Sequence, residues 1–472
     1  MTFYFYDLET SGISPRRDRV MQFAGQRTDS QLKPIGEPDN FLIKLSADIL
    51  PQPEAVLVTG ITPQKVNSEG MTEAEFLKHF AELVATPSTM IIGFNNIRFD
   101  DEFMRFMLWR NFYDAYEWQW KDDCSRWDLL DLARMTRALR PDGIAWPFAS
   151  DGKPSNRLGL LADLNKLRHV NAHDASSDVV ASIDLAKLIR EKQPKLFDYM
   201  LNMRSKNKVA ALLSSNEPFM YTSGRYPSEY IHTTAAVRLA DHPERSGSAL
   251  VYDLRVNPTP FLKMSATELA KRWSAWGREA PYFPVKILAY NKCPAIAPLS
   301  VLDEGSAERL ELTPELISMH NRLLTEEFSA RLLEALMLMK KSQQAQLVAD
   351  PMTVDEQLYE GFISEVDKTK MSVVRATDAS GISNLDLDFE DERLANLLPL
   401  YKARNFPDKL NDDERNAWDS FRQAKLLGGR EGSALAKYFA RLEELRASQG
   451  MSDEKKYLLD ELRLYGESIA PM

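Results

Sequence analysis

Near its start the chain reads Thr2-Phe3-Tyr4-Phe5-Tyr6-Asp7-Leu8-Glu9-Thr10-Ser11-Gly12, in which an apolar run leads directly into two acids and a small turn. The apolar run predicts a buried strand over Thr2–Tyr6. Side chains two apart on a strand share a face, so Asp7 and Glu9 should leave the end of this strand on one side. The turn after them is small and flexible enough for another segment to approach closely. Alone, this pattern is equally compatible with a solvated strand end.

The rest of residues 1–192 predicts a first domain of the α/β class, with a mixed sheet flanked by helices. Thr72-Glu73-Ala74-Glu75 forms a capping-box pattern that opens a helix through about Ala85. Apolar periodicity predicts strands at Val20–Thr28, Phe41–Leu45 and Met90–Phe94, and helices at 98–111, 125–140 and 174–191.

Two further domains are expected after the first. Residues 193–350 predict a β-containing domain, a small barrel or sandwich, with strands at 249–256, 284–290 and 295–302 between helices at 196–213 and 314–346. Residues 351–472 contain four amphipathic, nearly proline-free segments, at 390–404, 412–427, 434–448 and 453–467. These segments predict a helical C-terminal domain.

Composition restricts the possible classes of function. Of the 472 residues, 44% are hydrophobic and 27% charged, which is typical of a globular protein with several domains. The formal net charge of −10 argues mildly against a protein that coats duplex DNA, although a local basic groove could still hold one strand. No phosphate-binding loop, dinucleotide fingerprint or H-E-x-x-H zinc pattern is present.

The cysteines and the N-terminus bear on cofactor and compartment. Cys124 and Cys293 are far apart in the sequence, so neither a disulfide framework nor a cysteine zinc site is expected. Metal ligands should therefore be carboxylates, which suit Mg²⁺ or Mn²⁺. No basic segment precedes the first acid and no apolar run could span a bilayer. We therefore expect a cytoplasmic protein without a membrane partner.

Three further candidate residues lie beside predicted helix starts. Asp100 follows the turn after the strand at 90–94, where it could instead be a helix N-terminal acid favoured by the dipole, as could Asp101. Asp174 is a good N-cap, which would leave His173 on the loop before a helix and Asp178 on its second turn. Five residues within one helix would separate His173 and Asp178 by about 140°. A shared site therefore requires His173 to lie outside the helix.

Along the chain, an Asp-x-Glu pair at a strand end is followed by an acid at one helix start and by a histidine and an acid at a later one. This order indicates one catalytic pocket. Converging carboxylates repel one another by several kcal/mol unless cations neutralise them. Two Mg²⁺ ions would do so, and could also orient an attacking water at a phosphodiester. A histidine beside them could take the proton of that water near neutral pH.

This pattern resembles the DEDDh branch of the DEDD exonuclease superfamily, in which four acids and a histidine carry the chemistry. By this resemblance, the metal ligands and catalytic residues are Asp7, Glu9, Asp100 and Asp178, with His173 as the general base.

More specifically, the whole chain resembles the bacterial exonuclease I family. The resemblance extends through Gly93–Phe103, Ser125–Asp131, Asn291–Pro294, Asp355–Phe362 and Tyr401–Pro407. It implies a ribonuclease H-like exonuclease domain, an SH3-like domain and a C-terminal helical domain. It also implies a monomer that degrades single-stranded DNA processively from 3′ to 5′, releases 5′-mononucleotides and serves DNA repair and recombination. A single-stranded-DNA-binding protein is the implied partner.

Aromatic and basic residues after Asp100 suggest how a strand is held, because single strands bind to basic grooves with aromatic platforms. For Trp118 and Trp127 we favour a place in the core. Arg157 resembles the family's substrate-binding arginine, with a surface salt bridge as the alternative, and Glu9 could also touch the terminal 3′-hydroxyl. The expected strand contacts are Arg105, Tyr116, Trp120, Arg134 and Tyr199.

Two rival functions remain open at this point. The chain could be another DEDDh nuclease that acts on RNA or on a polymerase's mismatched primer, although the two extra domains argue against this. It could also be a noncatalytic scaffold that binds single strands, against which the intact set of five chemical residues weighs. Metal-dependent release of mononucleotides, compared on matched DNA and RNA, separates these functions.

Overall fold

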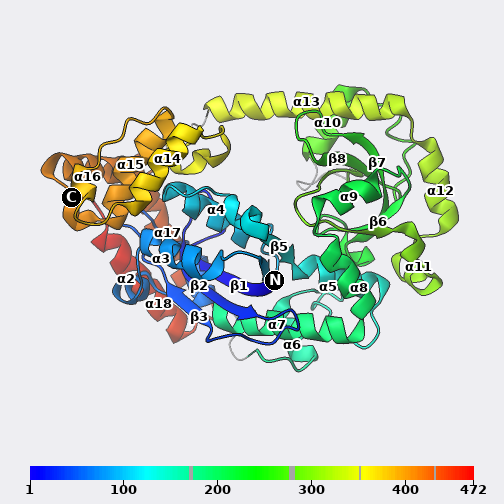
Figure 1. The fold of residues 1–472 in the computed structure, drawn as a ribbon, viewed down its shortest axis with the longest axis horizontal. Helices are drawn as coiled ribbons and strands as arrows, with labels where there is room; N and C mark the ends of the chain where they lie inside the picture. The colour runs from blue at the N-terminus through cyan, green and yellow to red at the C-terminus, as the bar shows by residue number, and fades with distance from the viewer. Residues whose placement is uncertain (170–173, 276–281, 350–351, 430–431, 472) are drawn as a thin grey trace. The chain divides into compact units, whose positions relative to one another are not determined.

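The structure is a computed structural model that describes residues 1–169, 174–275, 282–349, 352–429 and 432–471 (Figure 1). The chain divides into two compact units. The first combines Met1–Ser125, Val170–Val180 and Met352–Met472. The second combines Arg126–His169 and Ala181–Pro351. The division does not follow sequence order, because C-terminal helices belong to the same unit as the first strands.

The N-terminal region forms the mixed sheet that its sequence predicts. Strand β1 pairs antiparallel with β2 and parallel with β4. The strand order is β3-β2-β1-β4-β5, with β1 at Thr2–Thr10, β2 at Val20–Thr28, β3 at Asp39–Leu42, β4 at Thr89–Gly93 and β5 at Ser125–Asp128.

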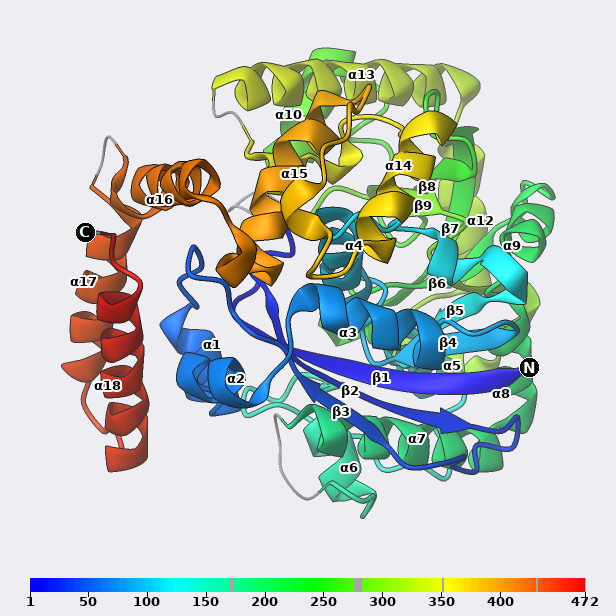
Figure 2. The ribbon, with the colours of Figure 1, turned by 60° about the vertical axis from the view of Figure 1, so that its left-hand side comes forward.

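Alternation along β1 separates its apolar and acidic side chains. Tyr4, Tyr6 and Leu8 belong to a core cluster with Phe76 of α3 (Glu73–His79) and Met104 of α4 (Asp100–Arg110). Figure 2 shows α3 and α4 on one side of the sheet. Because neighbouring strand residues point to opposite faces, the acids of β1 point to the other side.

Strand β1 runs four residues further than predicted, so its acids lie within the strand and not beyond it. Glu9 pairs with Gln22 of β2, and the register shifts only between Glu9 and Thr10. The carboxylates of Asp7 and Glu9 point out of the sheet, so they do not interrupt the backbone hydrogen bonds between β1 and β2. Gly12 then packs tightly within the same fold, because a Cβ there would lie 2.4 Å from the Asp18 carboxylate.

Other predicted boundaries were partly wrong in the first 140 residues. The segment predicted as one helix at 125–140 begins with β5, and α5 follows at Leu129–Leu139, with the Asp128 side chain accepting from Leu130 N–H. The third strand ends at Leu42 and not at Leu45. The capping box at Thr72 is confirmed, and a π-helical segment at Phe80–Val84 continues from α3.

The C-terminal part of the first unit is helical, as predicted, and packs on the N-terminal fold. The four predicted segments form α15 (Glu392–Asn405), α16 (Asp412–Leu427), α17 (Ala434–Arg446) and α18 (Asp453–Ser468), while α14 (Glu365–Ala376) was not predicted. Helix α18 contacts α1 (Pro53–Thr59) and α2 (Pro63–Glu69). Val56 of α1 shares a core cluster with Tyr438 and Leu458.

A chain of ion pairs also joins these two parts of the first unit. We call it the charge chain, and its members alternate in sign from one end to the other. Consecutive N···O distances are 2.8, 3.9, 2.9, 2.8, 2.8 and 2.6 Å along Arg110, Glu73, Arg19, Asp355, Arg404, Asp48 and Lys425. Burial alone would raise the pKa of Asp48 and Asp355, but the cations beside them, chiefly Arg404, hold both pKa values below the ordinary range.

The second unit contains a five-stranded antiparallel sheet of order β10-β6-β7-β8-β9. Strands β8, β9 and β10 occur where predicted, but β8 ends at Asp253 and not at 256, and β10 ends at Pro298 and not at 302 because a 3-10 helix follows at Leu299–Val301. Strands β6 and β7 were not predicted. The bounds are β6 Phe219–Thr222, β7 Thr233–Asp241, β8 Ser248–Asp253, β9 Val285–Ala289 and β10 Ala295–Pro298.

Helices of the second unit are shorter and more numerous than predicted. The segment at 196–213 is two helices, α8 (Pro194–Asn202) and α9 (Lys206–Leu213), and that at 314–346 is α12 (Pro314–Leu323) and α13 (Glu326–Ala349). The others in the described part of this unit are α5, already given, α6 (Leu158–Leu164), α7 (Ala175–Lys192), which begins in the first unit, α10 (Ala266–Ala275) and α11 (Glu304–Leu310). None of the helices in the described ranges has the length and apolar character needed to cross a membrane.

Candidate active site

Three of the predicted acids gather on the first unit. Asp7 and Glu9 come from β1, and Asp178 comes from the first turn of α7. Their nearest carboxylate oxygens all lie within 4.8 Å of one another. Helix α7 starts at Ala175, and the backbone carbonyl of Asp174 accepts from Asp178 N–H at 3.1 Å.

Asp100 contributes a fourth carboxylate to this acid cluster. It is the first residue of α4 and is buried. Its charge raises the pKa of both Asp7 and Glu9. His173, the predicted general base, lies outside the described residues.

The electrostatics of the acid cluster oppose full ionisation. Burial first, and then the charges of Asp100 and Asp178, raise the pKa of Asp7 well above its ordinary value. Burial and the charge of Asp178 likewise raise the pKa of Glu9 to about 8. Four carboxylates in so small a space can all be charged near neutral pH only when a cation neutralises them.

The geometry fits a hard divalent cation. Metal–oxygen bonds of about 2.0–2.1 Å place opposite ligands of one Mg²⁺ roughly 4.2 Å apart. The oxygens of Asp7, Glu9 and Asp178 are within 4.8 Å of one another, so a small closure of the side chains would bring them to that span. The donors are all carboxylate oxygens, the ligand type that hard cations prefer. The three residues therefore form a cluster able to hold a metal ion.

Metal binding should depend on pH with a definite sign. The raised pKa values of Asp7 and Glu9 mean that the folded, metal-free protein holds protons that the unfolded chain has lost, so raising the pH destabilises it. A divalent cation such as Mg²⁺ would replace those protons. We expect the rise in Tm on adding Mg²⁺ to be larger at about pH 9 than at about pH 6. Glu9→Gln should flatten this dependence, and an equal rise in Tm at both pH values in the unmodified protein would contradict the assignment.

A clamp on the opposite side of β1 places Asp100 beside Asp7. The Tyr6 hydroxyl donates to Asp101 Oδ1 at 2.6 Å, and Asn96 Nδ2 donates to the same oxygen at 3.1 Å. The backbone N–H of Asp101 donates to Asn96 O at 2.8 Å. Tyr6 and Asp101 each directly adjoin a member of the acid cluster in sequence. This clamp therefore fixes the start of α4 to β1, and we assign Asp101 a positioning role.

We expect Tyr6→Phe to lower Mg²⁺ affinity or activity by roughly 10–100-fold, the usual cost of losing a group that orients metal ligands. Tyr4→Phe is a matched control, because Tyr4 lies on the same face of β1 and donates to Asp39 at 2.6 Å, away from the acid cluster. Titration with Mg²⁺ and kcat at saturating Mg²⁺ measure the effect. Equal losses in the two variants would show a general effect on folding and refute the clamp.

Sequence reasoning missed a second polar contact beside the cluster. Gln22, which faces Glu9 across β1 and β2, donates through Nε2 to Asp174 Oδ1 at 3.3 Å and to Asn40 Oδ1 at 3.0 Å. The charge of Asp174 also contributes to the raised pKa of Glu9. The sequence pattern indicates only an N-cap role for Asp174. Its link to Gln22 depends on strand pairing, which no local pattern shows.

Three predicted strand contacts lie in the first unit, and two of them touch each other. Arg105 is buried, donates to Glu102 and Gln119 at 2.7 Å each, and lies over the Tyr116 ring at 5.2 Å. Tyr116 and Trp120 are exposed, Trp120 by 64%. Trp120 is thus the more exposed of the two aromatic residues. The guanidinium of Arg105 is already hydrogen-bonded to Glu102 and Gln119.

The other predicted contacts lie in the second unit. Arg134 pairs with Asp131 at 2.8 Å. Burial raises the pKa of Tyr199 to about 12, consistent with its packing at the edge of a core cluster. Arg157 is exposed as the N-cap residue of α6. Trp118 and Trp127 are buried, as expected.

Three family models match consecutive parts of the chain. Residues 4–186 match "Exonuclease", residues 204–337 match "Exonuclease I SH3-like domain", and residues 352–469 match "Exonuclease I C-terminal domain". The three matches confirm the predicted fold class.

Known proteins resemble the chain over its full length. Exodeoxyribonuclease I of Escherichia coli is 39% identical over 478 residues, 99% of this chain and 98% of the relative. The structure of Escherichia coli exonuclease I in complex with a dA16 oligonucleotide superposes with a TM-score of 0.91 at 39% identity, covering 99% of this chain and 100% of that one. A solved ExoI/SSB-Ct complex gives a TM-score of 0.91 at 38% identity, covering 99% of both chains. The chain therefore belongs to the exonuclease I family and is an exodeoxyribonuclease I homologue.

Proposed function

We propose that the chain is a processive 3′→5′ exodeoxyribonuclease that degrades single-stranded DNA to 5′-mononucleotides in repair and recombination. The acid cluster of Asp7, Glu9 and Asp178, with Asp100 beside it, is the observation that carries the proposal. The relative bound to a dA16 oligonucleotide supports single-stranded DNA as the substrate.

Two Mg²⁺ ions, with Mn²⁺ as an alternative, are the proposed cofactors of the acid cluster. When bound, they supply Lewis acidity and charge stabilisation at the phosphodiester. Asp7, Glu9, Asp100 and Asp178 would hold the cations, and the carboxylate of Glu9 would also accept from the terminal 3′-hydroxyl. His173 would take the proton of the attacking water, a role supported by its sequence pattern.

Strand binding is proposed at the residues expected from the sequence. Exposed Tyr116 and Trp120 offer surfaces on which bases can stack. The exposed Arg157 guanidinium suits bidentate contact with a phosphate. Arg105, Arg134 and Tyr199 remain further candidates, with Arg105 acting by holding the Tyr116 ring. A single-stranded-DNA-binding protein is the proposed partner, supported by the ExoI/SSB-Ct complex of a relative.

The proposed domain boundaries are 1–192, 193–350 and 351–472. The family models support this order, with matches at 4–186, 204–337 and 352–469. The two compact units divide the chain differently, because the C-terminal helices pack on helices of the N-terminal fold, α18 on α1 and α2.

End-labelled oligonucleotides test the proposal directly. A 5′-labelled single strand should shorten from its 3′ end with Mg²⁺, stay intact with EDTA, and resist digestion when its 3′ end is blocked. An excess of unlabelled strand added after binding tests whether each molecule digests its strand in one run. Binding without hydrolysis would support the noncatalytic scaffold instead, and equal digestion of matched RNA would support an RNA-directed nuclease.

A further inference from the structure

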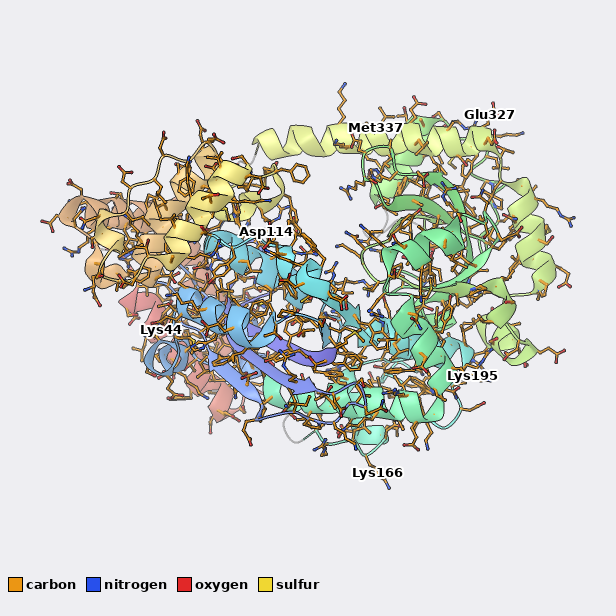
Figure 3. The ribbon with its side chains drawn as sticks, viewed as in Figure 1. Lys44, Asp114, Lys166, Lys195, Glu327 and Met337 are labelled. Carbon is orange, nitrogen blue, oxygen red and sulfur yellow. The ribbon has the colours of Figure 1, made fainter. Side chains whose placement is uncertain are left out.

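A cavity of about 340 Å³ lies beside the charge chain in the first unit. The N-terminal fold supplies one part of its wall, including Arg19, Lys44, Asn67 and Glu73. The C-terminal helices supply another part, including Arg404, Asn405 and Trp418. Figure 3 labels Lys44, one of these wall residues. The acids of the candidate active site do not line this cavity.

The charges around the cavity favour an anion. The charge chain contains four cations (Arg19, Arg110, Arg404, Lys425) and three carboxylates (Asp48, Glu73, Asp355), so it carries one positive charge in excess. The cavity reaches this chain at Arg19, Glu73 and Arg404. Its wall also carries Lys44 and Asp408, so its three cations exceed its two carboxylates by one charge. Buried charge is costly unless it is compensated. An anion in the cavity would compensate the excess.

The wall also carries neutral groups that suit a larger ligand than a simple ion. The side-chain carbonyl of Asn67 accepts from Leu45 N–H at 2.9 Å, and its amide NH₂ is a further donor at the wall. Trp418 is half-buried and stacks on Phe421 with 5.6 Å between ring centroids. Small-molecule pockets begin at about 300 Å³. The cavity, at about 340 Å³, therefore has the volume for more than an inorganic phosphate.

We propose that this cavity binds a phosphate monoester, with the phosphate group at Lys44 and Arg19 and, in a mononucleotide, the base against Trp418. Arginine and lysine both bind phosphate through charge-assisted hydrogen bonds. The ligand would contact segments far apart in the chain, the N-terminal fold and the C-terminal helices. Its binding energy would therefore add to the stability of their association.

Calorimetric titration of the full-length protein in EDTA tests this site without relying on nuclease activity. The probes are inorganic phosphate, dAMP and deoxyadenosine. We expect phosphate and dAMP to bind, dAMP more tightly, and deoxyadenosine alone not to bind. Binding of neither phosphate nor dAMP would overturn the proposal. Tighter binding of phosphate than of dAMP would overturn the place of the base.

Two substitutions separate the parts of the proposed site. Lys44→Glu should weaken phosphate and dAMP roughly tenfold or more, because a charge-assisted contact is lost and a repulsive charge is gained. Lys33→Glu makes the same charge change at another exposed lysine of the first unit and should have no effect. Trp418→Ala should reduce dAMP affinity to that of phosphate and leave phosphate binding unchanged. Equal behaviour of the two lysine variants would refute the site.

A final comparison excludes the candidate active site as the place of binding. Asp178→Ala in EDTA should bind phosphate and dAMP as the unmodified protein does. If dAMP binding required Mg²⁺ and vanished in Asp178→Ala, the ligand would occupy the acid cluster, and the proposal would fail while the proposed nuclease function stood.

Discussion

Asp178→Ala should lower cleavage of single-stranded DNA by roughly 10²–10⁴-fold, because a bound metal contributes several kcal/mol of transition-state stabilisation. Asp178 is one of three carboxylates whose oxygens lie within 4.8 Å of one another, so its loss removes a ligand from the centre of the acid cluster. Strand binding should survive, because the proposed aromatic contacts are unchanged. Single-turnover cleavage, Mg²⁺ titration and strand-binding affinity measure the three effects separately.

Two companion variants make this result specific. Asp178→Asn keeps the shape and removes the charge, so it should also lose Mg²⁺ affinity. Asp184→Ala removes an acid from the same helix that pairs with Arg168 at 2.8 Å, and should cleave normally. Turnover of Asp178→Ala equal to that of Asp184→Ala would show that the acid cluster is not the metal centre.

Asp355→Ala should be among the most destabilising single substitutions in the first unit. Its carboxylate accepts from both Arg19 at 2.9 Å and Arg404 at 2.8 Å, and its loss leaves two buried guanidinium groups facing each other. Breaking a buried ion pair costs about 3–5 kcal/mol. Thermal unfolding of the variant should therefore begin at a clearly lower temperature. Glu444→Ala, which removes an exposed partner of Arg441, is the control and should change little.

The same variant has a distinct signature in acid. The pKa of Asp355 is held below its ordinary value in the folded protein, so its contribution to stability is complete above the unfolded pKa of about 3.9 and is lost as the pH falls below it. Stability of the unmodified protein should therefore decline more steeply below about pH 4 than that of Asp355→Ala. If the stability of both proteins fell equally with pH, ionised Asp355 would not contribute to the stability of the folded protein.

The acids of the site were predictable because their signals are local. The Asp7-Leu8-Glu9 pattern follows an apolar run, although both acids prove to lie within β1, and Asp100 starts a helix after a turn, as expected. What holds these residues in place was not predictable. The bond from Tyr6 to Asp101 spans 95 positions, and Gln22 reaches Asp174 across 152. Such contacts depend on which strands pair and in which register, and neither follows from periodicity.

The missed elements had weak or misleading local patterns. Strand β7, Thr-Thr-Ala-Ala-Val-Arg-Leu-Ala-Asp, contains few large apolar residues, although its first five residues are buried. Strand β5 directly precedes α5, so its Arg126 and Trp127 were absorbed into one helical pattern. The sequence predicts the C-terminal helices as amphipathic, but their packing on the N-terminal fold depends on contacts such as that of Val56 in α1 with Tyr438. The amphipathic pattern therefore predicts the C-terminal helices but not the segments against which they pack.

One face of β1 carries the apolar core residues and the other carries the acids. This difference restricts insertions and deletions within the strand. Substitutions along the strand alter one face at a time, but inserting a single residue between Tyr6 and Asp7 would turn the acids toward the aromatic core. Hydrogen bonding of the backbone could continue, while carboxylates would meet the surface now occupied by Tyr6 and Leu8. Descendants of this chain should therefore vary freely in the loops around β1 and keep the spacing within it unchanged.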